Sequence, residues 1–319
     1  MYKTFFNLTR NPFELTPDPR FLFSTRRHDE ALAALYYGVR RHKGFVVVTG
    51  EVGTGKTLLL RCLLQLLQQS KDVAYAYLFN SLLSPTEFLQ YILADFGLPS
   101  SGKNKSEMLF DLSQFLIARG QKKLSTVLIV DEAHHLSAEI LEEVRLLTNL
   151  ETAEDKLLQI VLVGQPELDE KLDSTGLRQL KQRIAIRARL DPLSESEARG
   201  YIERRLRIAG ADDQASTIFS PTAITAIYHH SRGFPRLINT ICENALITGY
   251  AREMRSISPD VIEDVATDLC LGVVRPNAGH KTDGHSEVDI QRAINALLDL
   301  YTLHESDTNT PEVRTSERK

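Results

Sequence analysis

Cysteine is scarce in this sequence. Three cysteines, Cys62, Cys242 and Cys270, occur among 319 residues, and no two of them have the Cys-x-x-Cys spacing. An odd number of widely separated cysteines predicts neither a disulfide framework nor a zinc site. The scarcity indicates a protein of a reducing compartment.

Long apolar runs are also missing. No run reaches the roughly 18 consecutive apolar residues that a membrane-spanning helix needs, and the N-terminus has no apolar segment of signal-peptide length. The sequence therefore predicts a chain without a transmembrane segment. We expect it in the cytoplasm, or at the inner membrane only through a partner.

An excess of positive charge is absent as well. Lysine and arginine number 38 and aspartate and glutamate 42, which gives a net charge of −4. No overall cationic field therefore predicts binding to nucleic acid or anionic lipid, although a local basic patch remains compatible with these totals. With 42% hydrophobic and 25% charged residues, the composition is that of a globular protein and excludes disordered and collagen-like chains.

The first two thirds of the chain alternate between strand and helix patterns. Short runs rich in Val and Ile predict strands at 45–49, 73–79, 125–130, 158–164 and 184–190. Apolar residues at three- and four-residue spacing predict helices at 57–69, 85–97, 105–119, 137–150 and 167–182. The fold class is therefore α/β, with a five-stranded parallel sheet between helices.

Beyond Pro192 the pattern becomes entirely helical. Ser194 opens a capping box, and Ser220-Pro221 and Ser258-Pro259 are typical helix starts. We expect residues 1–28 to pack near the principal site, 29–190 to form the α/β core and 191–270 to form a small all-helical lid domain. Residues 271–286 are expected to be a linker, 287–304 an amphipathic helix and 305–319 a disordered tail. That helix either packs back on the body or docks a partner.

The strongest motif lies between the first strand and the first core helix. Residues 50–57 read GEVGTGKT, which is the phosphate-binding P-loop pattern in its required strand–loop–helix context. Glycines allow backbone N–H groups to face phosphate oxygens, Lys56 reaches the β and γ phosphates and Thr57 ligates magnesium. ATP and Mg²⁺ are therefore the expected cofactors. The residues expected to contact nucleotide are Gly50, Glu51, Val52, Gly53, Thr54, Gly55, Lys56, Thr57, Leu58, Pro235 and Arg236.

A buried strand ends in two carboxylates, Asp131 and Glu132. Asp131 is expected to hold the magnesium shell together with Thr57, and Glu132 to polarise the attacking water. Glu132 as a simple helix cap is the competing interpretation. His134 and His135 extend the motif to DEAHH, whose first four letters resemble the motif after which a group of helicases is named. No second sheet is predicted, however, so the histidines are interpreted as polar groups of the loop and first turn.

Two polar residues follow other strands. Asn80 ends the second strand and can hydrogen-bond Glu132 to hold it away from water, although a turn-forming asparagine is an equal alternative. Gln165 ends the fourth strand and can orient water or touch the γ phosphate, with a simple helix start as its alternative.

Two arginines complete the predicted catalytic set. Arg236, in the motif Gly-Phe-Pro-Arg, is expected to reach back from the lid to the γ phosphate. Arg183, where a helix meets the last strand, is a candidate arginine finger for the next subunit, with Arg178 in reserve. A solvated basic face is the alternative interpretation of this stretch.

The P-loop, the strand-end Asp-Glu pair, Gln165, Arg183 and Gly-Phe-Pro-Arg, in that order, resemble an AAA+ ATPase. The runs FFNLTRNPFELTPDPRFLFSTRRHDEALAALYYGVRRHKGFVVVTGEVGTGKT and LIVDEAHHLSAEILEEVRLLTNLETAEDKLLQIVLVGQPEL are further similar to the ExeA/GspA-type ATPases of type II secretion and of related exosortase and polysaccharide-export loci. Larger members of that type continue into a transmembrane segment and a peptidoglycan-binding domain, which this sequence does not contain.

The resemblance implies ATP hydrolysis at subunit interfaces of an ATP-dependent ring or filament. It implies work on a protein partner of a secretion or envelope-export system. Transposon-encoded ATPases that assemble on duplex DNA are also similar, so a DNA-bound regulator is the second hypothesis and a nucleotide-binding scaffold without hydrolysis the third. The basic residues available for DNA phosphates are Arg178, Lys181, Arg183, Arg187, Arg189, Arg204, Arg205 and Arg207.

Overall fold

The computed structural model describes residues 1–79, 83–153, 155–211 and 215–271. The described residues belong to one compact unit that extends to Gly272. Four predicted features lie outside the described residues: Asn80, the linker at 271–286 apart from Leu271, the helix at 287–304 and the tail at 305–319.

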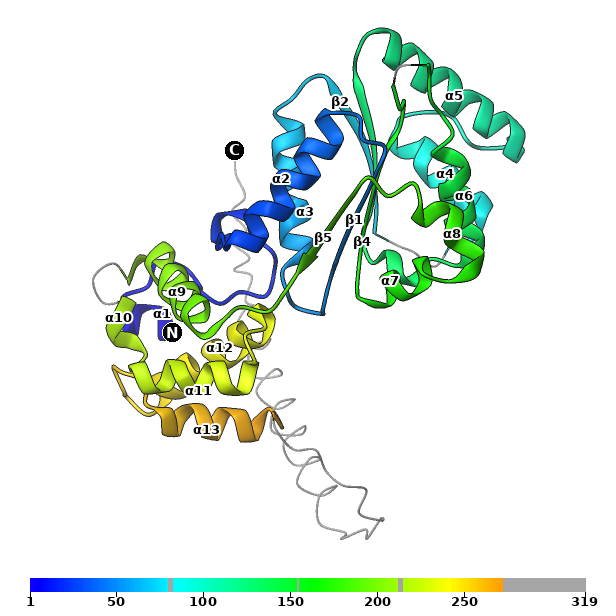
Figure 1. Cartoon of the computed structure of the whole chain (residues 1–319). Coiled ribbons are helices and arrows are strands. Elements are labelled where there is room, and N and C mark those ends of the chain that lie inside the picture. The colour runs from blue at the N-terminus through cyan, green and yellow to red at the C-terminus, as the bar shows by residue number, and fades with distance from the viewer. Residues whose placement is uncertain (80–82, 154, 212–214, 272–319) are drawn as a thin grey trace, which may run out of the picture. The chain divides into compact units, whose positions relative to one another are not determined.

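Five parallel strands form the sheet. They are β1 (Phe45–Gly50), β2 (Val73–Leu78), β3 (Ser125–Val130), β4 (Gln159–Gly164) and β5 (Ile186–Leu190), in the spatial order β2-β3-β4-β1-β5. The C-terminal ends of the strands lie along one edge of the sheet. In the strand register, Gly50 pairs with Leu190, Thr49 with Gly164 and Leu78 with Val130. The predicted five-stranded parallel sheet is confirmed (Figure 1).

Helices cover both faces of the sheet (Figure 1). One face packs on α2 (Arg26–Arg40) and α3 (Lys56–Gln68). The other face packs on α4 (Pro85–Asp95), α5 (Lys105–Gln121), α6 (Ala138–Leu147), α7 (Glu167–Leu172) and α8 (Arg178–Lys181). Successive residues of β1 alternate between the two cores, with Val46 and Val48 on one side and Phe45 and Val47 on the other. Burial on both faces explains why the inner strands β1, β3 and β4 are mainly apolar, whereas the edge strand β5 carries the arginines Arg187 and Arg189.

One predicted helix is divided in the structure. The pattern at 167–182 predicted a single helix, but α7 ends at Leu172, and α8 begins at Arg178 after a short 3-10 turn, η3 (Thr175–Leu177). Ser174 has an extended conformation with ψ 151°. The run Asp-Ser-Thr-Gly favours a turn, because short polar side chains compete for backbone hydrogen bonds and glycine lowers helix propensity.

The region after β5 is helical, as predicted. It contains α9 (Glu195–Leu206), the π-helical turn η4 (Arg207–Ala211), α10 (Ala215–Ile218), α11 (Pro221–Ser231), α12 (Pro235–Ala251) and α13 (Pro259–Asp268). Ser194 and Glu197 form the expected capping box at the start of α9. The N-terminal segment, with α1 (Tyr2–Phe5) and the 3-10 turn η1 (Pro19–Phe21), adds Phe6, Leu8 and Phe13 to the lid core.

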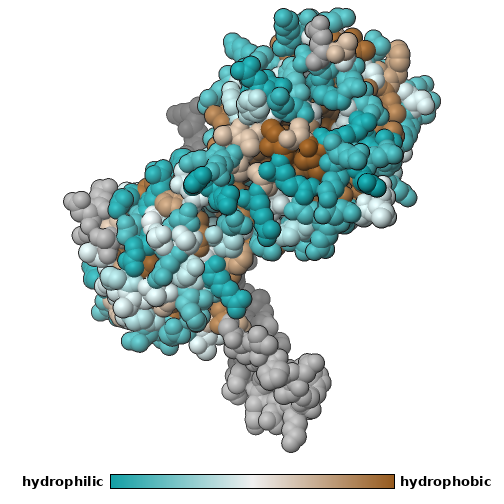
Figure 2. All heavy atoms as spheres, viewed as in Figure 1, coloured by the Kyte–Doolittle hydropathy of each residue, from teal (hydrophilic) through white to brown (hydrophobic). Residues whose placement is uncertain are grey.

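Apolar residues are concentrated in these cores. The surface seen in Figure 2 is mainly hydrophilic, and its largest visible hydrophobic area lies over the α/β part. The large exposed apolar side chains include Phe79 after β2 and Phe110 on α5. Within the residues that the structure describes, no helix has both the length and the apolar character needed to cross a membrane.

Candidate nucleotide-binding site

The start of α3 is built to face an anion. Gly55 is the N-cap residue, with φ 99°, and no side chain caps this helix, whereas α4 and α9 both begin with capping boxes. The first N–H groups of a helix have no intrahelical acceptor, and the helix dipole places partial positive charge there. The uncapped terminus therefore suits phosphate oxygens.

Glycine is required in this loop by close backbone packing. Gly53 has φ 82°, and a Cβ atom there would lie 2.9 Å from Cβ of Arg236. A Cβ atom on Gly50 would lie 2.8 Å from the carbonyl oxygen of Leu190. The loop consequently follows a path that side chains would block.

Lys56 is turned back onto the loop that carries it. Its Nζ donates to the carbonyl oxygens of Gly50 at 2.8 Å and Glu51 at 3.0 Å. Burial lowers the pKa of Lys56, an effect opposed by the nearby Glu132 and Asp131 carboxylates. The ammonium group is thus positioned beneath the loop, within reach of an anion bound there.

Asp131 and Thr57 bring two oxygen donors together. Thr57 Oγ1 lies 3.2 Å from Asp131 Oδ2, which also accepts from Tyr77 Oη at 3.1 Å. The other carboxylate oxygen accepts the backbone N–H of Glu132 at 2.9 Å. Burial raises the pKa of Asp131, so a cation at this point would compensate for its desolvation. Hard oxygen donors of this kind fit Mg²⁺.

Glu132 follows in an unusual backbone conformation, with φ 51°. Its Oε2 atom is buried, has no hydrogen-bond partner among the described residues and faces His134 Nδ1 at 3.4 Å. His134 lies in the 3-10 turn η2 (Ala133–His135), and its Nε2 lies 2.7 Å from Nε2 of Gln165. Glu132, His134 and Gln165 are therefore adjacent at the C-terminal edge of the sheet.

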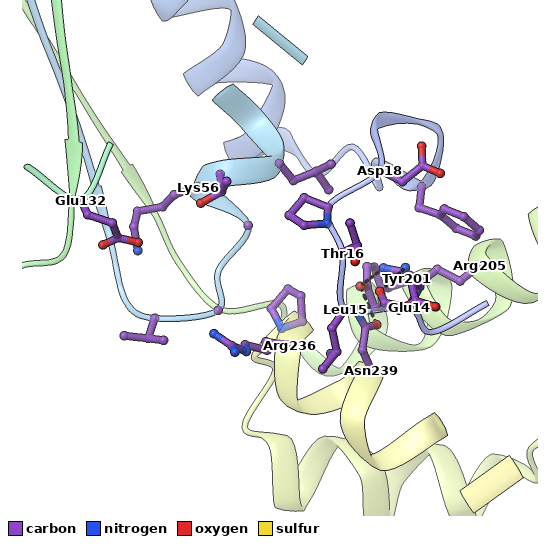
Figure 3. Close-up of a pocket in the computed structure, with 18 of the residues that line it drawn as sticks. Glu14, Leu15, Thr16, Asp18, Lys56, Glu132, Tyr201, Arg205, Arg236 and Asn239 are labelled. Carbon is purple, nitrogen blue, oxygen red and sulfur yellow. Dashed lines mark hydrogen bonds between the residues drawn. The ribbon is translucent and has the colours of Figure 1, made fainter. Parts of the chain in front are cut away.

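A cleft of about 370 Å³ lies beside these groups. Figure 3 shows Lys56 and Glu132 on one side of it and residues of the N-terminal segment and of the lid on the other. The backbone N–H of Arg236 donates to the Gly53 carbonyl at 3.3 Å, so the lid contacts the P-loop directly. The residues lining the cleft are Glu14, Leu15, Thr16, Pro17, Asp18, Phe21, Val52, Gly53, Gly55, Lys56, Thr57, Leu58, Glu132, Gln165, Tyr201, Arg205, Pro235, Arg236 and Asn239.

A buried arginine fastens the N-terminal segment to the lid. Arg205 is 4% exposed and donates to the carbonyl of Pro12 at 2.5 Å, to Tyr201 Oη at 2.5 Å and to the carbonyl of Glu14 at 3.3 Å. Tyr201 in turn donates to Asn239 at 2.8 Å. The sequence-based assignment of Arg205 to DNA phosphates is therefore wrong, because its guanidinium is buried in this network.

Other predicted residues lie outside the cleft. The carbonyl groups of Gly50 and Glu51 accept hydrogen bonds from Lys56 Nζ, and the Thr54 hydroxyl donates to the Glu51 carbonyl at 2.8 Å. Arg183 precedes β5 at the opposite edge of the sheet, where its Nη1 donates to Thr148 Oγ1 at 2.6 Å. Within one chain, Arg183 is thus remote from the P-loop.

Three residues next to the P-loop and the Asp131–Glu132 pair were given no role by the sequence analysis. His28 is buried behind the P-loop, with Nε2 3.2 Å from the Thr54 carbonyl and Nδ1 2.7 Å from Thr25 Oγ1. No local motif marks it, because only packing brings α2 to the loop. Tyr77 looked like an ordinary strand residue, and His134 was interpreted as a loop residue, although its position two residues after Glu132 was a usable signal.

The chain is similar in sequence to known proteins. A family model described as an AAA domain matches residues 39–172. The chain is 46% identical over 258 residues to general secretion pathway protein A of Aeromonas hydrophila, an alignment that covers 81% of this chain and 46% of that protein. It is 26% identical over 151 residues to a potential ATP-binding protein of Staphylococcus aureus, covering 47% and 53%. The chain spans about half the length of these relatives.

Solved structures share the fold at lower identity. The ORC2 protein of Aeropyrum pernix superposes with a TM-score of 0.60 at 18% identity, covering 81% of this chain and 71% of that one. The RuvB Holliday junction branch migration motor of Thermotoga maritima gives 0.52 at 16% identity, covering 88% and 77%. At such identities the likeness concerns the fold alone. Sequence and fold together show an AAA domain at residues 39–172, with the fold of AAA+ P-loop proteins, in a chain that is similar to general secretion pathway protein A.

Proposed function

We propose that this chain binds ATP with Mg²⁺ and hydrolyses it between subunits of a homo-oligomer, to drive assembly or remodelling of a secretion or envelope-export component. The observation that carries the proposal is the cleft in which the P-loop, Glu132 and the lid residue Arg236 converge. A site built only to hold a nucleotide would not need an acidic side chain beside the terminal phosphate position.

The phosphate end of the cleft gives each group a distinct task. Lys56 and the uncapped start of α3 bind phosphate oxygens, and Thr57 and Asp131 hold the magnesium ion. The ion would neutralise charge on the β and γ phosphates. Glu132 polarises the attacking water, and Gln165 contacts the terminal phosphate or that water.

The end of the cleft away from the phosphate groups suits the base of the nucleotide. Leu15 and Pro17 from the N-terminal segment, Leu58 from α3 and Pro235 from the lid provide apolar contacts, and Asn239 provides a polar edge. Because these residues come from the N-terminal segment, the core and the lid, a bound nucleotide would hold all three together. This arrangement supports coupling between the nucleotide state and the lid.

Arginines supplied by a neighbouring subunit would complete the site. Arg183 lies at the opposite edge of the sheet from its own P-loop, as a residue acting on the next subunit must. Its side chain is held by Thr148, whereas the Arg178 side chain is exposed and makes no ion pair or hydrogen bond within the described part of the chain. Arg183 remains our first candidate and Arg178 the reserve.

The DNA hypothesis has less support from the surface charges. Lys181, Arg187 and Arg189 lie 2.6 Å, 3.1 Å and 3.5 Å from carboxylates of Asp173, Asp169 and Asp191. Their charges are partly neutralised, and Arg205 is buried. We therefore favour a protein partner of the secretion type, with a cytoplasmic location or attachment to the inner membrane through that partner.

One experiment tests the proposal and its alternatives. We expect the purified chain to hydrolyse ATP with Mg²⁺, and a Glu132→Gln variant to lose that activity. The rate would be measured alone, with duplex DNA, and with membrane or cell-wall fractions. Stimulation by duplex DNA only would favour the DNA-bound regulator, and nucleotide binding without turnover in any condition would favour the scaffold.

A further inference from the structure

The Glu132 carboxylate lacks a hydrogen-bond partner for one of its oxygens among the described residues. One of its oxygens, Oε2, is buried and has no hydrogen-bond partner among the described residues, while the residue itself lies in the left-handed region at φ 51°. A buried oxygen without a partner is destabilising, and more so if it is charged. Such a cost is tolerated where a group must be able to change partners.

His134 is the residue that faces this oxygen, and its position is fixed. It is 7% exposed. The Lys171 ammonium group donates to the carbonyl of His134 and, at 3.1 Å, to that of Leu136, so α7 holds the turn that carries the ring. The backbone N of His134 also packs within 3.1 Å of where a Cβ on Gly164 would lie. A firmly held backbone limits the ring to small adjustments.

Both nitrogens of His134 contact Gln165, and one of them also faces Glu132. Nδ1 accepts the backbone N–H of Gln165 at 3.4 Å and lies 3.4 Å from Glu132 Oε2, and Nε2 lies 2.7 Å from Gln165 Nε2. Burial lowers the pKa of His134, which favours the neutral ring with one donor and one acceptor nitrogen. With the proton on Nε2, Nδ1 accepts the Gln165 backbone N–H. With the proton on Nδ1, that nitrogen can instead donate to Glu132 while Nε2 accepts from the Gln165 side-chain amide. Only a small movement of Glu132 is needed to shorten the first contact to hydrogen-bond length.

We propose that His134 is a positioning residue that links Glu132 to Gln165, so that the orientation of the carboxylate depends on whether Gln165 engages the terminal phosphate. When the Gln165 amide turns toward a phosphate, the imidazole loses its partner and adjusts against Glu132. ATP and ADP then set different positions for the water-polarising group. This inference rests on the proposed ATPase function.

Substitutions at two adjacent histidines separate positioning from folding. His134→Leu removes both links, and His134→Asn keeps an amide donor near the position of Nδ1 but cannot reach Gln165. The same changes at His135, which is exposed and lies 3.9 Å from His134 by ring centroid, are the matched controls. ATP and ADP affinities and thermal unfolding would be measured for each variant alongside kcat and KM.

We expect His134→Leu to lower kcat roughly 10-fold or more while the affinity for ATP changes by less than about 3-fold, as for other groups that orient a catalytic side chain. His134→Asn should recover part of kcat. Both His135 variants should stay within about 2-fold of wild type.

Coupling to Gln165 is tested by a double-mutant cycle. If the two residues act through one link, His134→Leu combined with Gln165→Leu should lose little more than the worse single variant. Losses that multiply, or a His134→Leu variant with wild-type kcat, would overturn the role of His134. A wild-type chain that binds ATP but never hydrolyses it would instead overturn the proposed function, and the inference with it.

Discussion

The backbone N–H of Arg236 and the carbonyl of Gly53 are joined by a hydrogen bond of 3.3 Å, which attaches the first turn of α12 to the P-loop. The Arg236 side chain lines the same cleft, and Figure 3 shows it extending from the start of α12 toward the P-loop side. We therefore expect a change in the P-loop on nucleotide binding to be transmitted to the lid.

This contact predicts a nucleotide-dependent lid. Small-angle X-ray scattering of the wild-type chain should show a more compact or more assembled particle with a non-hydrolysable ATP analogue than with ADP. The reason is that Arg236 gains a γ-phosphate partner only with the analogue. Arg236→Ala should erase most of that difference. Arg204→Ala, which removes an exposed lid arginine outside the cleft, should preserve it. If the difference between the ATP-analogue and ADP states persists in Arg236→Ala, Arg236 does not make the lid respond to the γ phosphate.

Substitutions of Lys56 and Glu132 should separate binding from turnover. Lys56→Ala should weaken ATP binding roughly 10-fold or more, since it removes a charged phosphate contact. Glu132→Gln should bind ATP normally and lower kcat about 100-fold or more, since it removes the water-polarising group. Equilibrium binding of a fluorescent nucleotide and steady-state phosphate release measure the two effects. Normal turnover by Glu132→Gln would contradict its role.

Arg183 should act on the neighbouring subunit. Arg183→Ala and Lys56→Ala chains, each nearly inactive alone, should regain activity when mixed, because a mixed interface pairs an intact P-loop with an intact arginine. The same mixture with Arg178→Ala in place of Arg183→Ala compares the two candidates. If neither mixture exceeds the sum of its components, the arginine does not act between subunits.

His28 should make stability depend on pH. Burial lowers the pKa of His28, so the unfolded chain binds a proton more readily than the folded one. The stability is therefore fully present above the unfolded pKa of about 6.5 and is lost as pH falls toward the lower folded pKa. Urea unfolding between about pH 5 and pH 8 should show this loss in wild type and a smaller slope in His28→Gln. An identical slope in both proteins would assign the effect to other groups.

Gly233 should tolerate no side chain. It has φ 77°, and a Cβ atom there would lie 2.0 Å from the Leu193 carbonyl oxygen. Gly233→Ala should lower the free energy of unfolding by at least about 1 kcal/mol and shift the turn that carries Arg236. Gly176→Ala is the control, because nothing lies within 4 Å of the added atom. Equal stability of the two variants in chemical denaturation would refute the steric argument.

Local patterns predicted much of the α/β core. Apolar alternation and helix caps act over a few residues, so the strands and the caps at Ser84 and Ser194 followed from neighbours in sequence. The division of the helix predicted at 167–182 was missed, because the turn at Ser174 overrides a weak apolar period. Arg205 was misassigned, because its burial depends on the N-terminal segment about 190 residues away.

The sequence by itself determined that a P-loop joins a strand to a helix, and that Asp131 and Glu132 end a buried strand, because these features depend on residues close together in the chain. Only the tertiary structure decided which side chains surround them. His28 reaches the P-loop through the packing of α2, Tyr77 reaches Asp131 through the pairing of β2 with β3, and His134 meets Gln165 because β3 and β4 are neighbours. Such contacts depend on strand order and helix packing, which join residues far apart in the chain and leave no local pattern.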